Sequence, residues 1–226
     1  MEPIAARRLE EKERRRSEIL DAAERVAAAV GVEPLTMEQV AREARLSRGL
    51  LYIYFKDKQD LLAGICERAL TGLYTRFVWV VDERQSGLER VLAMGRAYVA
   101  FATECQLQFE VLARFEARDA TTTDTDGHLY ACLAAGARVH ALITTALEVG
   151  MRDGSVAASA GNPETIALAL WAMTHGTIQV ASMKRAVLEQ HQVTPTALVE
   201  QTLRMAAVSL QAGLAPPDAA LKESGA

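Results

Sequence analysis

The fold is decided by one stretch, TMEQVAREARLSRGLLYIYF, which occupies residues 36–55. Thr36 can cap the start of a helix and Gln39 can return a hydrogen bond to it, which is the spacing of a capping box. Ser47 provides a second helix start a few residues later. The stretch therefore predicts two short helices joined by a tight turn at residues 45–47.

The second of these helices has a core face and outward faces. Leu51 and Phe55 lie four residues apart, so both can pack on the first helix. The other faces carry a cation and two phenols, at Arg48, Tyr52 and Tyr54. The helix is about 12 Å long, which matches the width of the DNA major groove. DNA contact is therefore expected; alternatively, the tyrosines are core or interface aromatics of a small three-helix bundle.

The rest of the chain is also patterned for helices. Apolar residues make up 50% of the chain and aromatic residues only 5%, so Ala, Leu and Val supply most of the core. Asn162 before Pro163 and Thr194 before Pro195 are strong helix starts. An all-α fold of about nine helices is expected. The predicted helices span residues 17–30, 36–44, 47–55, 58–80, 86–104, 108–118 and 129–150, and two more start at 163 and 195.

The long helix expected at residues 129–150 carries an apolar stripe. We expect this stripe to face the core, because it recurs at helical spacing. The helix is expected to end at Gly150–Gly154. The residues of the stripe are Leu129, Leu133, Ala137, His140, Ile143 and Leu147.

The chain is expected to divide into a small N-terminal module and a larger remainder. Residues 1–64 form the predicted helix-turn-helix domain, residues 65–212 form a larger helical domain, and residues 213–226 form a disordered tail. The charged run RRLEEKERRR, residues 7–16, has two interpretations. It is either a frayed, solvated extension of the first helix or a basic arm that contacts phosphate or the minor groove.

Charge and cysteine usage exclude several classes of protein. The net charge is −4 and residues 1–60 hold as many basic as acidic side chains, so a nucleic-acid surface has to be a local face. The three cysteines are odd in number and widely spaced, which argues against a disulfide framework or a zinc knuckle. The chain lacks a signal-peptide pattern and an apolar run of membrane-spanning length, so we expect a cytoplasmic protein without a membrane partner. Without a phosphate-binding glycine loop, a nucleophile elbow or a CxxC motif, no enzyme activity, cofactor or metal site is expected.

The segment TMEQVAREARLSRGLLYIYFKDKQDLL, residues 36–62, resembles the DNA-binding segment of TetR-family transcriptional regulators. A weaker likeness to the family's dimerisation helices lies in WAMTHG, residues 171–176. The resemblance implies that the second helix of the motif enters the major groove, with Arg48 pairing with guanine, while flanking residues contact phosphates. Carried over by position, the DNA-binding residues are Thr36, Met37, Arg45, Ser47, Arg48, Gly49, Leu50, Tyr52, Ile53, Tyr54 and Lys58.

Two residues depart from the pattern of the family. Arg45 stands where many relatives have glycine, and a positive φ there would cost an arginine on the order of 1 kcal/mol. Leu50 stands where a small hydroxyl residue is frequent, so contact with a thymine methyl group replaces a hydrogen bond. The DNA sequence that relatives bind therefore does not carry over to this chain.

The resemblance also implies a regulated dimer. A homodimer through the last two helices would bind a palindromic double-stranded DNA operator as a repressor, and a mostly hydrophobic small-molecule effector would release it. The alternative function is a helical protein–protein adaptor without specific DNA binding. Each effector candidate is alternatively an ordinary core side chain. The candidates are Tyr74, Phe77, Phe101, Cys105, Phe109, His128, Cys132, His140, Trp171 and His175.

Overall fold

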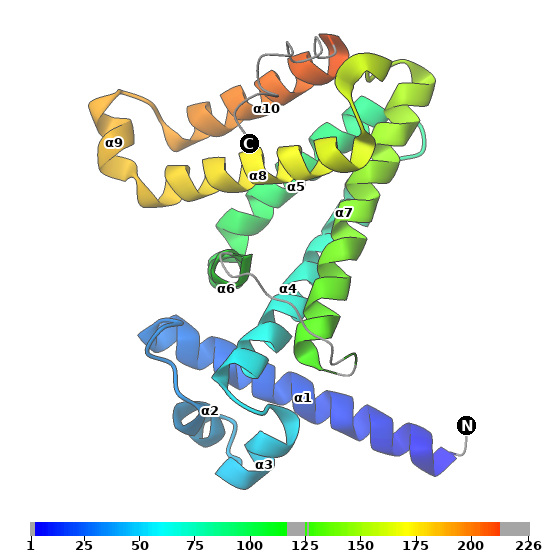
Figure 1. Cartoon of the computed structure of the whole chain (residues 1–226). Coiled ribbons are helices and arrows are strands. Elements are labelled where there is room, and N and C mark those ends of the chain that lie inside the picture. Colours follow the sequence, from blue (N-terminus) through cyan, green and yellow to red (C-terminus); the bar gives the residue numbers. More distant parts are fainter. Residues whose placement is uncertain (1–2, 117–124, 126, 213–226) are drawn as a thin grey trace, which may run out of the picture. The chain divides into compact units, whose positions relative to one another are not determined.

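The computed structural model describes residues 3–116, 125 and 127–212 of the chain. This part of the chain holds ten α-helices, one 3-10 helix and no strand, which confirms the all-α prediction (Figure 1). The chain splits into two compact units, Met1–Tyr74 with Phe101–Ala137 and Thr75–Ala100 with Arg138–Ala226. The domain boundary after residue 64 stays a prediction. The tail expected at residues 213–226 lies outside the described residues.

The first unit is built on the long N-terminal helix. Its helices are α1 (Pro3–Val30), α2 (Met37–Glu43), α3 (Arg48–Tyr54) and α6 (Gln106–Glu116), with the first parts of α4 (Lys58–Val80) and α7 (His128–Asp153). Helix α1 packs against α2 and α6, and α2 packs against α3. Large apolar side chains from four of these helices, from the α1–α2 connection and from the residue after α3 fill the core: Ile19, Leu20, Val32, Leu35, Val40, Leu51, Phe55, Leu61 and Ile65.

The second unit is built around a pair of packed helices. It contains α8 (Pro163–Met183), α9 (Arg185–Gln190), α10 (Pro195–Ala212), a short 3-10 helix (Ala158–Ala160), most of α5 (Gly87–Glu104) and the remaining parts of α4 and α7. Helices α8 and α10 lie side by side, and α9 connects them at one end (Figure 1). The start of α5 meets the end of α7 at backbone contact, because a Cβ on Gly87 would lie 2.0 Å from the nitrogen of Gly150.

Most of the predicted helix starts are confirmed. Asn162 accepts from the backbone N–H of Thr165 at 3.1 Å, which is the cap expected before α8. Helix α6 begins two residues earlier than predicted, at Gln106. The short α9 was not predicted, and the charged run continues helix α1 to Pro3, which was one of the two interpretations of that run. Each has a local reason, because α1 is laced with ion pairs at helical spacing and Leu188 buries one side of α9.

The apolar stripe expected on α7 is only partly buried, because Leu147 lies in the core whereas Leu133 and Ala137 are exposed. Leu133 is 40% exposed, whereas the buried positions of that half of the helix are Cys132, Ala135 and Val139. The two successive steps of four residues from Leu129 to Ala137 advance by about 800°, about 80° more than two full turns, so these positions drift off the buried face of the helix. The buried face instead alternates steps of three and four residues, as the 3.6-residue turn requires.

Two helices of the described chain, α7 and α8, are long and apolar enough to cross a membrane by length and composition alone. This is weak evidence for a span, because long apolar helices of soluble proteins pass the same test. Apolar side chains on the outside of α8 include Leu168, Val180 and Met183.

Candidate nucleic-acid interface

The helix-turn-helix is held by local hydrogen bonds that the sequence predicted. Thr36 Oγ1 accepts from the backbone N–H of Gln39 at 3.3 Å, and Gln39 Oε1 accepts from the backbone N–H of Thr36 at 2.8 Å, so the capping box is complete. Ser47 Oγ accepts from the backbone N–H of Leu50 at 3.2 Å and starts α3. Arg45 in the turn has a φ of 55°, the left-handed conformation suspected from the sequence. The turn therefore keeps its strained geometry without glycine.

Helix α3 has the two-sided character expected from its sequence. Leu51 and Phe55 are both 0% exposed, so one face is committed to the core of the first unit. On the opposite side Tyr52 is 43% exposed and Ile53 is 76% exposed. Arg48 and Gly49 are exposed as well, while Leu50 and Tyr54 are half-buried. A seven-residue helix thus presents a mixed apolar, phenolic and cationic surface to its surroundings.

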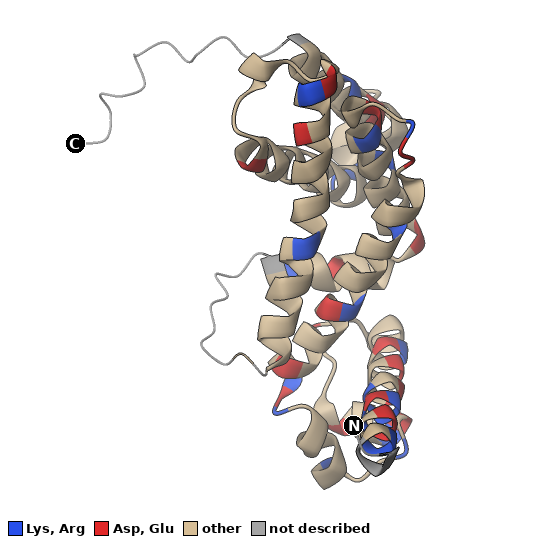
Figure 2. Ribbon diagram, turned by 90° about the vertical axis from the view of Figure 1, so that its right-hand side faces the viewer, with Lys and Arg blue, Asp and Glu red and all other residues tan. Residues whose placement is uncertain are grey.

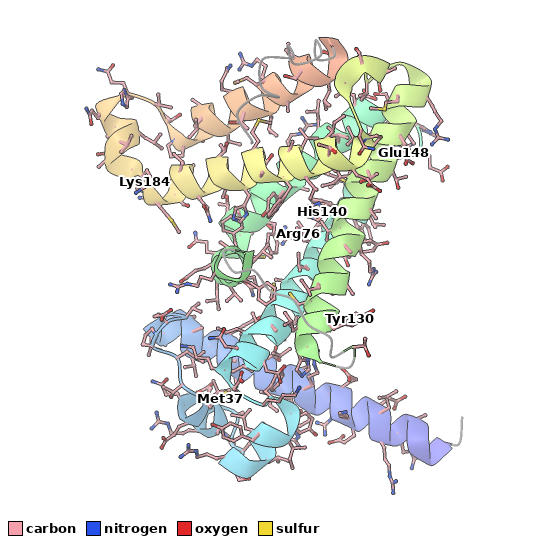
Figure 3. All side chains as sticks on the ribbon, viewed as in Figure 1. Met37, Arg76, Tyr130, His140, Glu148 and Lys184 are labelled. Atoms are coloured by element: carbon pink, nitrogen blue, oxygen red, sulfur yellow. The ribbon has the colours of Figure 1, made fainter. Side chains whose placement is uncertain are left out.

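The residues predicted to contact phosphate differ in what they can offer. Thr36, Arg45 and Ser47 are exposed. Met37, at the start of α2 (Figure 3), is 8% exposed, so its side chain belongs to the core and only its backbone amide is left for a phosphate. Lys58 Nζ donates to the carbonyl oxygen of Glu33, which holds this ammonium group close to the protein surface.

Arg48 is the candidate for reading guanine, and its guanidinium group is not committed to a strong partner. Its contact with Glu38 measures 3.9 Å between Nη1 and Oε2, and both side chains are well exposed. An ion pair of this kind is worth about 0–1 kcal/mol at most. Arg48 can therefore exchange this contact for a base edge at little cost.

A basic groove lies between the N-terminal part of α1 and the end of α3. It has a volume of about 390 Å³ and is lined by Arg7, Arg8, Glu11, Lys12 and Tyr54. Acidic and basic side chains alternate along α1 (Figure 2). This groove links the charged run of the sequence to α3, a long-range relation that local patterns do not reveal.

The ion pairs of α1 leave the cations of the groove free. Glu11 pairs with Arg14 at 2.6 Å, which lowers the pKa of Glu11 through a side-chain hydrogen bond, and Glu18 pairs with Arg14 and Arg15. Among the described residues, Arg7, Arg8 and Lys12 have no ion-pair partner.

The second unit contains a cluster of polar aromatic side chains that the sequence had singled out in part. The hydroxyl group of Tyr98 lies 2.7 Å from Nδ1 of His175, and Nε2 of Gln179 lies 3.0 Å from Nε2 of the same ring. Trp171 contacts both His175 and His140, with ring centroids 5.9 Å and 5.5 Å apart. Tyr98 and Gln179 were not among the predicted effector residues, because neither stands out within its helix.

The two imidazoles of this cluster are in an environment that favours the neutral ring. Burial lowers the pKa of His140 and of His175 below the ordinary value of 6.5. Within the described part of the chain, Nδ1 of His140 is buried without a hydrogen-bond partner. His140 lies on α7 (Figure 3). The cluster therefore offers neutral polar atoms among aromatic rings.

The other effector candidates do not all lie in this unit. Phe77 is buried in the second unit, whereas Tyr74, Phe101, Cys105, Phe109, His128 and Cys132 belong to the first. His128 stacks on Phe55 with ring centroids 4.6 Å apart, so it lies against the helix-turn-helix. The described residues contain no group of three or more potential metal ligands.

The fold and the exposed face of α3 define the class of protein: it is a helical protein with an N-terminal helix-turn-helix whose second helix is exposed on one side. Residues 19–65 match the family described as bacterial regulatory proteins, tetR family. Over 50 residues the chain is 46% identical to the HTH-type transcriptional regulator HbdR of Aromatoleum sp. (strain CIB), a match that covers 22% of each chain. The chain thus spans under a quarter of the length of that relative, and about a third of a Staphylococcus aureus HTH-type regulator to which it is 37% identical.

Solved structures extend the likeness to the whole fold. A tetR-family regulatory protein from Rhodococcus RHA1 superposes with a TM-score of 0.65 at 19% identity, covering 89% of this chain and 98% of the other. The regulator FadR of Bacillus subtilis, solved in complex with stearoyl-CoA, superposes with a TM-score of 0.65 at 16% identity, covering 84% and 97%. Residues 19–65 therefore match the tetR family of bacterial regulatory proteins, and the likeness of the whole chain to these solved structures is one of fold.

Proposed function

We propose that this protein is a transcriptional repressor that binds a palindromic DNA operator as a homodimer and is released by a small molecule. The observation that carries the proposal is the division of α3 into a fully buried face and an exposed face. A short helix that is anchored by Leu51 and Phe55 and exposes Arg48, Tyr52 and Ile53 suits insertion into a major groove. Since such a reader acts on chromosomal DNA, the protein is expected in the cytoplasm.

The basic groove supports the proposal because it adds a surface for the phosphate backbone. Arg7, Arg8 and Lys12 are free to pair with phosphates, and Tyr54 continues this surface onto α3. Contacts of this kind fix the register of a reader on the duplex without carrying sequence information. The charged run in α1 then acts as a helical phosphate contact, which combines the two interpretations left open by the sequence.

The dimer is proposed to form through α8 and α10. Both helices carry large apolar side chains on the outside, among them Met183, which is 68% exposed, and Val208, which is 58% exposed. Two such helices meeting a symmetric copy form a four-helix interface, and two reading helices then enter grooves about 34–36 Å apart. Analytical ultracentrifugation should give a mass twice the 24.6 kDa of one chain, and a mass near 25 kDa would remove the dimer.

The effector is proposed to bind at the cluster of Tyr98, His140, Trp171 and His175. Its neutral imidazoles and aromatic rings favour a mostly hydrophobic ligand with one or two neutral polar groups. Stearoyl-CoA, the ligand in the FadR structure, serves as one probe next to uncharged aromatic compounds.

The two tryptophans make this ligand proposal measurable. Trp79 is 83% exposed, whereas Trp171 lies within the cluster. In a Trp79→Phe variant, a ligand at the cluster should change the fluorescence of Trp171. In a Trp171→Phe variant, the same ligand should leave the signal of Trp79 unchanged. A response that comes only from Trp79 would place the ligand elsewhere.

The experiment that tests the DNA function is selection of bound fragments from the source genome, followed by measurement of base preference. Arg48→Ala should still bind at low salt but should lose its preference at one base pair of each half-site, because a bidentate contact to guanine is worth about 1–3 kcal/mol. Arg185→Ala, which removes an exposed cation from α9, serves as the matched control and should keep the full preference. If the wild-type protein enriches no sequence and its DNA affinity does not depend on salt, the alternative of a helical adaptor is favoured.

A further inference from the structure

The first residue of α7 makes three contacts around the end of α3. The ring of His128 stacks on Phe55 with an interplanar angle of 27° and a centroid distance of 4.6 Å. Its Nε2 lies 3.0 Å from the carbonyl oxygen of Tyr54, and its Nδ1 lies 3.2 Å from Nη2 of Arg16. One imidazole therefore contacts the last residue of α3, the residue after it, and α1.

The partners assign the tautomer of this imidazole. A carbonyl oxygen only accepts, so the Tyr54 contact requires a proton on Nε2. A guanidinium group only donates, so Nδ1 is the acceptor for Arg16. His128 is therefore neutral in this arrangement and uses both ring nitrogens.

The contact with Tyr54 fills a need of the short helix. The last carbonyl groups of any α-helix lack partners within the helix, and α3 has only seven residues. The Leu51 carbonyl accepts from the backbone N–H of Phe55 at 3.0 Å. The Tyr54 carbonyl accepts from His128, so a side chain 74 residues away in the sequence completes the C-terminal end of α3.

The imidazole is itself held in place by neighbouring helices. Arg16 of α1 also forms an ion pair with Glu67 of α4, and the two side chains are only 18% and 26% exposed. A partly buried, charge-assisted pair is more rigid than a solvated one. The position of His128 is thus coupled to α1 and α4 as well as to α7.

We propose that His128 is a positioning residue that caps α3 and transmits movements of α7 to it. The proposal rests on the function of α3 as the DNA-reading helix and assigns the residue through which its position is regulated. Helix α7 is continuous from His128 to Asp153 and carries His140 of the aromatic cluster. A change at the start of α7 withdraws the cap and the stacked ring together, which frees the end of α3.

Hydrogen exchange without DNA tests the capping role directly. In His128→Phe the stacked ring is kept and both hydrogen bonds are lost, while His128→Gln keeps a donor for the Tyr54 carbonyl. The amide exchange rate of a peptide covering α3 should become about fivefold to tenfold faster in His128→Phe, because the end of the helix loses one hydrogen bond. In His128→Gln the exchange rate of this peptide should stay within about twofold of the wild-type rate. A peptide covering α2 should be unchanged in both variants.

Operator binding is the second measurement. His128→Phe should raise the dissociation constant about fivefold to tenfold without changing which bases are preferred, since the reading side chains are intact. If the exchange rate of α3 is unchanged in His128→Phe, the proposal is overturned. It is also overturned if α2 and α3 exchange faster to the same extent and the Tm falls, because the variant then destabilises the whole unit. If neither the wild type nor the variants bind DNA while α3 alone exchanges faster, the capping role stands and the DNA function fails.

Discussion

Replacing Arg7, Arg8 and Lys12 together by glutamine is expected to flatten the salt dependence of operator binding. These three cations line the groove beside Tyr54 and have no ion-pair partner within the described chain. Glutamine has nearly the same helix propensity as lysine and arginine, so α1 should keep its structure. The variant therefore isolates the charge of the groove.

The size of the effect follows from counterion release. Each cation that pairs with a phosphate contributes about 0.9 to the slope of log affinity against log salt concentration. A dimer loses six cations, so the slope should fall in magnitude by up to about 5. Between about 50 and 200 mM salt, the wild-type protein should then lose about 10³-fold more affinity than the variant.

Fluorescence anisotropy of a labelled operator at several salt concentrations provides the slopes. A matched control replaces Arg84, Arg152 and Arg185 by glutamine, which changes the net charge equally through exposed residues of the second unit. The control should keep the slope of the wild type. Equal slopes for the groove variant and the wild type would refute the assignment of the groove to phosphates.

Three further predictions concern stability and are measured by urea unfolding. Gly64→Ala should lower the free energy of unfolding by about 1 kcal/mol, because its Cβ would lie 2.9 Å from Cε1 of the buried Phe55. Gly72→Ala, on the same helix, meets nothing within 4 Å and should raise the free energy of unfolding by about 1 kcal/mol. The reverse order of the two variants would contradict the packing. Arg45→Gly should raise the free energy of unfolding by up to about 1 kcal/mol, because glycine adopts the positive φ without strain. The same variant should bind DNA more weakly, because it lacks the cation. A lower free energy of unfolding would argue against strain in the turn. Burial lowers the pKa of His140 and His175, so as the pH falls the unfolded chain binds protons before the folded chain does. The free energy of unfolding should keep their full contribution above about pH 6.5 and decline as the pH falls toward the lower folded pKa values. A double variant, His140→Phe with His175→Phe, should lose this part of the pH dependence.

The sequence predicted the helix-turn-helix because its determinants are local. The caps at Thr36 and Ser47 and the four-residue spacing of Leu51 and Phe55 can all be read within twenty residues, and the structure has them as expected. Even the positive φ of Arg45 was indicated by the glycine that many relatives have at that position. Short-range hydrogen bonds and helical periodicity are sufficient for such an element.

Contacts between residues that are far apart in the chain could not be predicted from local sequence patterns. The stack of His128 on Phe55 joins residues far apart in the chain, and an isolated histidine at a helix start carries no local signal for it. The groove beside Tyr54 likewise depends on how α1 passes α3. The buried face of the first half of α7 was missed because two successive steps of four residues, from Leu129 to Ala137, drift off one face of the helix and bring Leu133 to the exposed side.

Cleavage of operator DNA by a reagent tethered to α3 tests most directly whether the exposed face of this helix enters DNA. Ile53 is 76% exposed, so an Ile53→Cys variant in a Cys105→Ser background can carry an iron chelate, while Cys66 and Cys132 are buried. A chelate at position 53 should cut the operator at two sites related by its symmetry, and a chelate on Trp79→Cys should not cut there. Absence of localised cleavage from position 53, with the operator still bound, would contradict DNA reading by α3.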